Sequence, residues 1–343
     1  MAETVLSNAP LPEAEQPPER PQHFWVKAGL FLIRRREASI IIIAIALTVY
    51  FGLVTNFVTR ENLPIISAYV AADAIVATGE VFVLISGEID LSVGAVAAFA
   101  PFIMYFLTQD GVPLLPSIIV ALLVCAGIGL LNGTVTVLLK VPSLITTLGT
   151  QFLISGITLI ISSGEPIPTP SFGSVNNFLG AANYVEFIWA IAVVIVFQIV
   201  LSFTRWGLHT VAAGGNLLGA SEAGVAVNRI KIANFVLVSV LGGLAGMLEV
   251  FRVGSIDPLA NGDGGTYLMF AAVAGAVIGG TSLVGGSGTV VGALLGCLTL
   301  SLVQDGLILL GVNANTFDVV LGIAILLAMI ANIAITRWRE SGK

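Results

Sequence analysis

The sequence contains little charge for its length. Lys, Arg, Asp and Glu make up 10% of its 343 residues, whereas an average soluble domain has about 25%. A water-soluble fold of this size needs more polar surface, so the composition excludes a soluble globular protein. Hydrophobic residues make up 57% of the chain, and the mean hydropathy is +1.01. In lipid, long apolar runs form helices, whereas a barrel shows short alternating segments. We therefore expect an all-α polytopic membrane protein.

Cysteine and histidine are also scarce, with two residues of each. Cys125 and Cys297 both lie in apolar runs, which indicates neither a disulfide framework nor a metal site. His23 and His209 have no neighbours at metal-ligand spacing. We expect no metal and no cofactor, and we interpret all four as core or loop residues.

The sequence does contain many long apolar runs. About ten segments after Arg36 are long enough to cross a hydrocarbon core of about 30 Å, which takes about 20 helical residues. The predicted helices are centred near these residues: Thr48, Ile75, Ala100, Gly127, Phe152, Val194, Leu241, Val273, Leu300 and Ala328.

Basic residues predict the orientation of these helices. An even number of crossings puts both termini on one side, and a cytoplasmic placement leaves only Arg60 and Arg252 outside. This asymmetry predicts an N-in/C-in topology. We expect residues 1–37 to form a cytoplasmic tail with an interfacial helix rather than a cleaved signal peptide. Residues 38–336 then form the transmembrane domain, and residues 337–343 a cytoplasmic tail.

A first motif follows the second predicted helix. Its members are Gly87, Glu88, Asp90, Ser92 and Gly94. Gly87 allows a break or a positive φ, and Asp90 is well placed to cap the next helix. Capping alone explains such an aspartate. The functional interpretation is a broken helix end that lines a gate or a solute path.

A second motif lies in a long inner loop, from about residue 205 to 228. Its members are Gly215, Asn216, Ala220, Glu222 and Gly224. The pattern predicts a short surface helix over 217–223 that ends at Gly224. The loop is either a plain cytoplasmic linker or a docking helix for a soluble partner.

A third motif is rich in glycine and lies between the eighth and ninth predicted helices. It begins with Gly279, Gly280, Thr281 and Ser282 and continues to Gly288. So many glycines indicate unwound backbone or tight packing, which lipid tolerates only where it is buried or faces water.

Together these three motifs resemble the permeases of bacterial monosaccharide importers of the ATP-binding-cassette (ABC) type, which carry ribose, xylose, arabinose or galactose. The resemblance spans roughly residues 40–335 and implies a multi-pass protein of the bacterial inner membrane. It also implies three partners: a second permease subunit (a copy or a paralogue), a cytoplasmic ATPase and an extracytoplasmic sugar-binding protein. By resemblance, the ATPase docks around Asn216 to Gly224. The sequence departs from the family pattern at Glu88, where glycine is common.

The chain carries no nucleotide site of the phosphate-loop type. Such a loop requires Gly-Lys-Ser/Thr, and none of the four lysines (Lys27, Lys140, Lys231 and Lys343) stands in that pattern. We find no nucleophile, metal set or acid pair of an enzyme either. We therefore predict a transport subunit, with ATP hydrolysed on a separate subunit.

Two sets of polar residues lie at membrane depth. Asp73 and Glu80 are seven residues apart on one helix face, and acids there cost about 2.5–3.5 kcal/mol on insertion scales. They either form interhelical hydrogen bonds or line a path. A stripe on the fifth predicted helix either joins helices or forms the wall of a path for a neutral polyol. The members of the stripe are Thr147, Gln151, Ser155 and Thr158.

Two other functions stay open at this point. A branched-chain amino acid permease of the related importer type shares the architecture but differs in the motif around Asp90. An ion-coupled secondary transporter is the second alternative, in which Asp73 and Glu80 carry protons.

Overall fold

The computed structural model describes residues 36–259, 264–313, 316–327 and 330. Its first helices are α2 (Arg36–Val54), α3 (Leu63–Ile85), α4 (Val93–Gln109), α5 (Leu114–Leu138) and α6 (Ser143–Ser162). Next come β1 (Ile167–Pro168), α7 (Ser174–Asn176), the π-helix η1 (Asn177–Ala181), α8 (Val185–Phe203), α9 (Arg205–Gly215) and α10 (Leu217–Glu222). The last labelled elements are α11 (Val227–Val253), β2 (Ser255–Ile256), α12 (Thr266–Ile278) and α13 (Val290–Leu309). A further apolar helix covers Thr316–Leu327. The predicted all-α class is confirmed.

Among the described residues, six helices are long and apolar enough to cross a membrane: α3, α5, α6, α8, α11 and α13. Four apolar segments are shorter, namely α4, α12, Ser39–Val54 within α2, and Thr316–Leu327. Nine of the predicted centres lie in helices, and Ala328 lies outside the described residues. The predicted tails also lie outside the described residues, except for Arg36 and Glu37, which begin α2.

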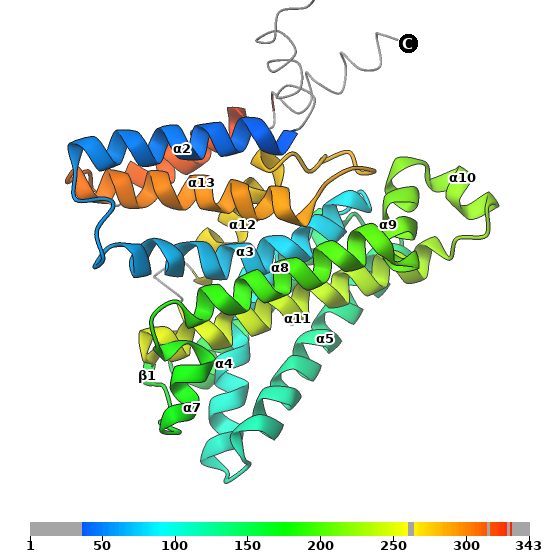
Figure 1. The fold of residues 1–343 in the computed structure, drawn as a ribbon. Coiled ribbons are helices and arrows are strands. Elements are labelled where there is room, and N and C mark those ends of the chain that lie inside the picture. The colour runs from blue at the N-terminus through cyan, green and yellow to red at the C-terminus, as the bar shows by residue number, and fades with distance from the viewer. Residues whose placement is uncertain (1–35, 260–263, 314–315, 328–329, 331–343) are drawn as a thin grey trace, which may run out of the picture.

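Helix α3 lies at the centre of the molecule. Helix α13 runs along one side of it with α2 beyond, and α8 and α11 run along another side (Figure 1). Every residue of α3 from Asp73 to Ile85 is buried. A helix that is apolar all round is typical of such a central position.

Small residues allow the helices around α3 to approach closely. A Cβ atom added to Gly79 of α3 would lie 2.6 Å from the Val238 Cα of α11. A Cβ atom added to Gly133 of α5 would lie 2.9 Å from the Ile232 Cα, which is also in α11. This is the small-residue packing of membrane helices, since lipid provides no hydrophobic force between them. Glycine at these positions therefore serves the α11 interfaces.

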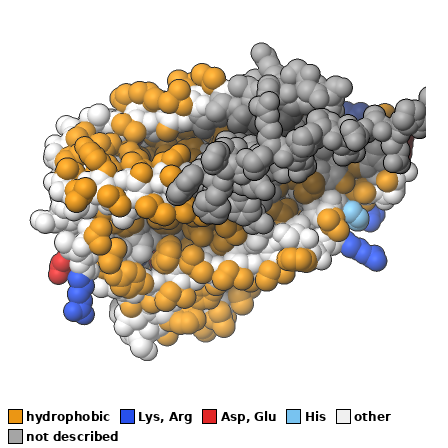
Figure 2. Space-filling view, turned by 45° about the horizontal axis from the view of Figure 1, so that its top comes forward, with side chains coloured by type: hydrophobic (Ala, Val, Ile, Leu, Met, Phe, Trp, Pro, Cys, Tyr) orange, Lys and Arg blue, Asp and Glu red, His pale blue; other side chains and the backbone are white. Residues whose placement is uncertain are grey.

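The outer surface is apolar between two polar ends. Helices α5 and α6 expose large side chains such as Leu123 (64%) and Phe152 (78%). Figure 2 shows hydrophobic side chains over the middle of the described face and charged ones towards its ends. An apolar surface of this extent is typical of contact with lipid.

The two ends of the helix bundle differ in structure (Figure 1). At the β1 end, β1 pairs antiparallel with β2, with Ile167 opposite Ile256, and α7 and η1 lie beside them. At the α10 end, α9 and α10 project from the bundle beyond the carboxyl end of α8. We call these two ends the β1 end and the α10 end.

Candidate functional site

The first motif breaks the chain after α3 and contacts α11. Gly87 has a φ of +80°, which only glycine adopts easily. The next side chain, Glu88, forms an ion pair with Lys231 of α11, with Nζ and Oε1 2.6 Å apart. Both side chains are largely buried, so the pair is shielded from water. The predicted helix break is confirmed, and the ion pair joins it to α11.

Asp90 is the centre of a buried polar network. Its carboxylate accepts hydrogen bonds from the Ser92 backbone N–H (2.8 Å) and from the Ser92 hydroxyl (2.6 Å). Asn132 of α5 donates to the Ser92 hydroxyl (2.8 Å) and accepts from Thr150 of α6 (2.6 Å). Burial raises the pKa of Asp90, while the hydrogen bonds from Ser92 and Asn132 act in the opposite direction. The network therefore fixes the segment before α4 against α5 and α6.

The prediction that Asp90 caps the third predicted helix is wrong in detail. Helix α4 begins at Val93, and its capping position is held by Ser92, which makes no side-chain cap hydrogen bond. Two residues of turn separate Asp90 from the helix, so within this segment its side chain bonds to Ser92 and not to the first turn of α4. Gly94, in the first turn, lies against the backbone of Gly265, where a Cβ atom has no space.

The third motif is unwound, as predicted. Gly280, Gly285 and Gly286 have φ values of +91°, +94° and +77°. Thr281 and Ser282 are buried between these glycines. Gly279 ends α12 in direct contact with the Gly292 backbone of α13, which explains the need for a small residue there.

All three motifs meet at the α10 end. The Gly286 N–H donates a hydrogen bond to the Ile85 carbonyl at the end of α3 (2.8 Å). A Cβ atom on Gly214, in the last turn of α9, would lie 2.8 Å from the Gly286 nitrogen. One on Gly286 would lie 2.7 Å from the Gly215 Cα. We call this contact of residues 85–87, 214–215 and 285–286 the glycine junction. It joins the backbone of three segments that are far apart in the sequence.

The short surface helix of the second motif is confirmed. The Asn216 side chain accepts a hydrogen bond from the Gly219 N–H at 2.9 Å, the standard arrangement of a helix N-cap. Helix α10 then runs to Glu222, and Gly224 follows with a φ of +83°. Ala220 is buried against α9, with Ala213 in the same apolar cluster.

The outer face of α10 is exposed and partly apolar. Leu217 and Leu218 are 56% and 69% exposed, and Glu222 is exposed beside them. Two adjacent leucines on a projecting, capped helix are typical of a surface that another protein covers.

Asp73 and Glu80 are both buried in α3, at 5% and 0% exposure. Neither carboxylate oxygen of Glu80 has a hydrogen-bond partner among the described residues. The expectation that the two acids lie at membrane depth agrees with this burial, and their place on a solute path stays a prediction.

The polar stripe on α6 makes contacts within and between helices. The hydroxyls of Thr147 and Thr158 donate to carbonyls of their own helix (2.8 Å each). Gln151 donates to the Thr266 hydroxyl of α12 at 3.3 Å, and a Cβ atom on Gly264 would lie 3.7 Å from the Ser155 hydroxyl. The geometry places the stripe towards the start of α12, and its role as a wall stays a prediction.

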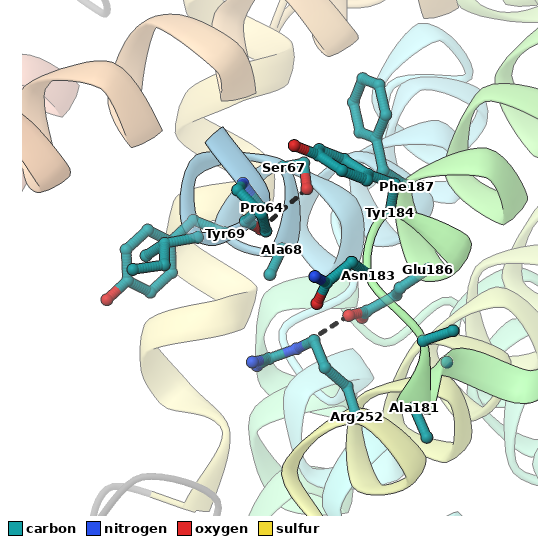
Figure 3. Close-up of a pocket in the computed structure, with 13 residues that line it drawn as sticks. Pro64, Ser67, Ala68, Tyr69, Ala181, Asn183, Tyr184, Glu186, Phe187 and Arg252 are labelled. Atoms are coloured by element: carbon teal, nitrogen blue, oxygen red, sulfur yellow. Dashed lines mark hydrogen bonds and ion pairs between the residues drawn. The ribbon is translucent and has the colours of Figure 1, made fainter. Parts of the chain in front are cut away.

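The β1 end contains a pocket of about 300 Å³. It lies between the start of α3, the segment 180–187 and the end of α11 (Figure 3). Glu186 and Arg252 both line it and form an ion pair, with Nε and Oε2 2.9 Å apart. Arg252 also donates hydrogen bonds to Glu249, one turn earlier in α11.

Sequence reasoning missed three parts of these sites. Asn132 and Thr150 were not identified, although an amide between Gly129 and Gly133 in an apolar helix is a usable signal. Glu186 was not identified at all, and Arg252 was used only to predict topology. Their pairing is not visible in the sequence, because they are separated by 66 positions (252 − 186).

The chain matches the family described as "Branched-chain amino acid transport system / permease component" over residues 62–329. Its relatives include the xylose/arabinose import permease protein of Sulfolobus acidocaldarius, 38% identical over 88% of this chain and 86% of the relative. The ribose import permease protein of Escherichia coli is 33% identical over 91% of this chain and 96% of the relative. The D-allose transport system permease protein of the same species is 32% identical over 89% and 91%. No solved structure matches.

Proposed function

We propose that this chain, which belongs to the family of branched-chain amino acid transport system / permease components, carries a monosaccharide into the cytoplasm. As a member of this family it is a multi-pass permease subunit of an ABC importer in the inner membrane. It is a transport subunit rather than an enzyme, and ATP is hydrolysed on a separate subunit.

The substrate proposal rests on the named relatives. Three of them are named as permeases for xylose and arabinose, for ribose, and for D-allose, and each of these matches covers most of both chains. All of these solutes are neutral polyols of similar size. The family description alone names branched-chain amino acids. We therefore favour a pentose or hexose over an amino acid.

For the topology, we infer ten crossings with both termini in the cytoplasm. The four shorter apolar helices are then crossings as well, because they lie among the longer ones in a single bundle. Lys140, Arg205 and Arg229 lie near helix ends at the α10 end, whereas Arg60 and Arg252 lie near those at the β1 end. The excess of positive charge makes the α10 end cytoplasmic. The transmembrane domain is residues 38–336 in this proposal, flanked by cytoplasmic tails.

The glycine junction is the observation that carries the proposed mechanism. A partner that moves α10 would displace Gly214 and Gly215, and these contact Gly286 without intervening side chains. Gly286 in turn is bonded to the end of α3 at Ile85. Because closely packed backbone segments cannot move independently, a movement of α10 would also displace the first and third motifs. In our proposal the ATPase docks on α10, and residues 87–94 and 279–282 form the gate.

The docking surface consists of the second motif and the exposed side chains beside it. Asn216 caps α10, Gly224 ends it, and Ala220 fixes it to α9. Leu217 and Leu218 then present apolar area to the ATPase. A second permease subunit and an extracytoplasmic sugar-binding protein complete the proposed importer, the latter at the β1 end.

Transport assays test this function directly. The importer, reconstituted in proteoliposomes with the ATPase and binding protein encoded beside it, is supplied with radiolabelled D-xylose, L-arabinose, D-ribose or D-allose. We expect uptake of at least one of these sugars that requires ATP and continues when an uncoupler collapses the proton gradient. Uptake of L-leucine in place of the sugars, or uptake abolished by the uncoupler while ATP is maintained, contradicts the proposal.

A further inference from the structure

The pocket at the β1 end has the size of a small-molecule site. Its volume of about 300 Å³ is at the lower end of the range of roughly 300–1,000 Å³ for such sites. Backbone and side chains from three elements form its walls, including Ser67 and Ala68 of α3 and Tyr184 before α8. The three elements come from distant parts of the sequence, so only the folded bundle forms the pocket.

Glu186 gives this pocket a buried carboxylate, one oxygen of which lies outside its ion pair with Arg252. Its side chain is 2% exposed and lines the pocket. Its Oε2 lies 2.9 Å from the Arg252 Nε in the ion pair, whereas Oε1 has no hydrogen-bond partner among the described residues. A buried acceptor without a partner is costly and rare in native structures. A hydroxyl donor placed in the pocket would satisfy it.

Arg252, the nearest cation, is already engaged. Its Nε and a terminal nitrogen both donate to Glu249, and the same Nε forms the ion pair with Glu186. Two carboxylates therefore surround one guanidinium. An anionic ligand would be repelled by them and would compete with Glu249 for the arginine. A neutral ligand with several hydroxyl groups avoids this competition.

Aromatic and amide groups complete the walls. Tyr184 and Phe187 project from the start of α8, and Asn183 lies next to Glu186 (Figure 3). Flat aromatic faces and planar polar groups together suit a sugar ring, which has apolar C–H faces and a belt of hydroxyls.

We propose that this pocket is a solute site at the outer mouth of the permease, where Glu186 accepts hydrogen bonds from the hydroxyls of one monosaccharide. The proposal rests on the sugar-import function above and adds a discrete site on the permease itself. The pocket holds the solute between its release from the binding protein and its passage beside α3.

Cysteine protection tests occupancy of the pocket. Asn183→Cys is introduced into the assembled importer, and right-side-out membrane vesicles without binding protein are treated with a membrane-impermeant maleimide. The native thiols, Cys125 and Cys297, are both buried, so they contribute little background. We expect millimolar amounts of the imported sugar to slow alkylation of Asn183→Cys by about tenfold, the change for roughly 1.4 kcal/mol of binding.

Val175→Cys is the matched control. Val175 is exposed on α7 at the same end but does not line the pocket. Its alkylation should be independent of sugar. Equal protection of both cysteines, protection of Asn183→Cys by L-leucine rather than by sugars, or no protection at all overturns the proposal.

A pair of isosteric variants then tests the role of Glu186. Glu186→Gln keeps the shape but weakens the acceptor, and we expect the KM for uptake to rise about tenfold because hydrogen bonds to charged groups are the stronger ones. Glu249→Gln changes the other acid on Arg252 without lining the pocket and should raise KM less. An equal rise in KM for Glu186→Gln and Glu249→Gln would assign the effect to the charges around Arg252 and overturn the proposed site.

Failure of this site is distinguishable from failure of the proposed function. If the wild-type importer takes up sugar with ATP but Glu186→Gln has an unchanged KM and Asn183→Cys is unprotected, only the site is wrong. If the wild-type importer takes up none of the four sugars, the function is wrong and the site proposal is overturned with it.

Discussion

The two ends of the bundle differ in what they are made of. At the β1 end, charged and aromatic side chains surround a pocket, and Glu186 and Arg252 form an ion pair in its wall. At the α10 end, glycines bring three segments into backbone contact. Side chains that line a pocket can recognise a solute. Backbone segments in direct contact, as in the glycine junction, can transmit a displacement. In our proposal, recognition and coupling are therefore located at opposite ends of the bundle.

The largest expected effect is at the glycine junction. Gly214→Val places a branched side chain against the Ile85 carbonyl and the Gly286 nitrogen, where even a Cβ atom has no space. Overpacking of this kind costs about 1–3 kcal/mol, and we expect ATP-driven uptake to be lost. Transport by the reconstituted importer measures this.

Gly156→Ala is the matched control for that substitution. Nothing lies within 4 Å of a Cβ atom on Gly156 in α6, so uptake should be unchanged. The helix should gain about 0.5–1 kcal/mol, visible as a small rise in the thermal midpoint in detergent. Normal transport by Gly214→Val would show that the glycine junction at the α10 end is not needed for coupling.

The buried network around Asp90 gives the next effect. Asn132→Leu removes the partner of Ser92 and Thr150. Ser92 keeps its bond to Asp90 and Thr150 its bond to the Thr146 carbonyl, so the cost is that of the lost hydrogen bonds, about 0.5–1.5 kcal/mol each. We expect a clear fall in the thermal midpoint of the purified permease. Thr134→Val, on an exposed face of α5, should change it little, and equal shifts in the two variants would contradict the network.

Some of this could be predicted from the sequence. The break at Gly87 and the ends of α10 were predicted correctly, because local backbone chemistry decides them: a glycine with positive φ, and an Asn cap followed by a glycine stop. The contact of Gly214 with Gly286 was not predicted, because it depends on how α3, α9 and the loop after α12 pack. For the same reason the partners of Glu88 and Glu186 became visible only in the fold.

A moderate effect is expected from the ion pair that joins the first motif to α11. Glu88→Gln leaves Lys231 largely buried without its partner. The cost should fall between about 1 kcal/mol for an exposed pair and about 3 kcal/mol for a buried one. The double variant Glu88→Gln with Lys231→Met should recover part of the loss in thermal stability. If the double variant loses as much stability as the two single variants together, the pair does not couple the two segments.

The smallest expected effect is on the cap of α10. Asn216→Ala removes the hydrogen bond to Gly219, which should cost about 0.5–2 kcal/mol of local helix stability. We expect weaker stimulation of the ATPase by the permease, with little change in the thermal midpoint of the whole bundle. Asn216→Asp retains a capping oxygen and should restore the stimulation. Failure of that rescue would assign Asn216 a role other than capping.

Sidedness tests the central claim most directly, because coupling from the cytosol requires α10 to face the cytoplasm. Ser221→Cys on α10, which is exposed, and Asn183→Cys at the β1 end are treated separately with an impermeant maleimide, in intact cells and in inverted vesicles. We predict that cells label only Asn183→Cys and inverted vesicles only Ser221→Cys. Labelling of Ser221→Cys in intact cells would contradict the account.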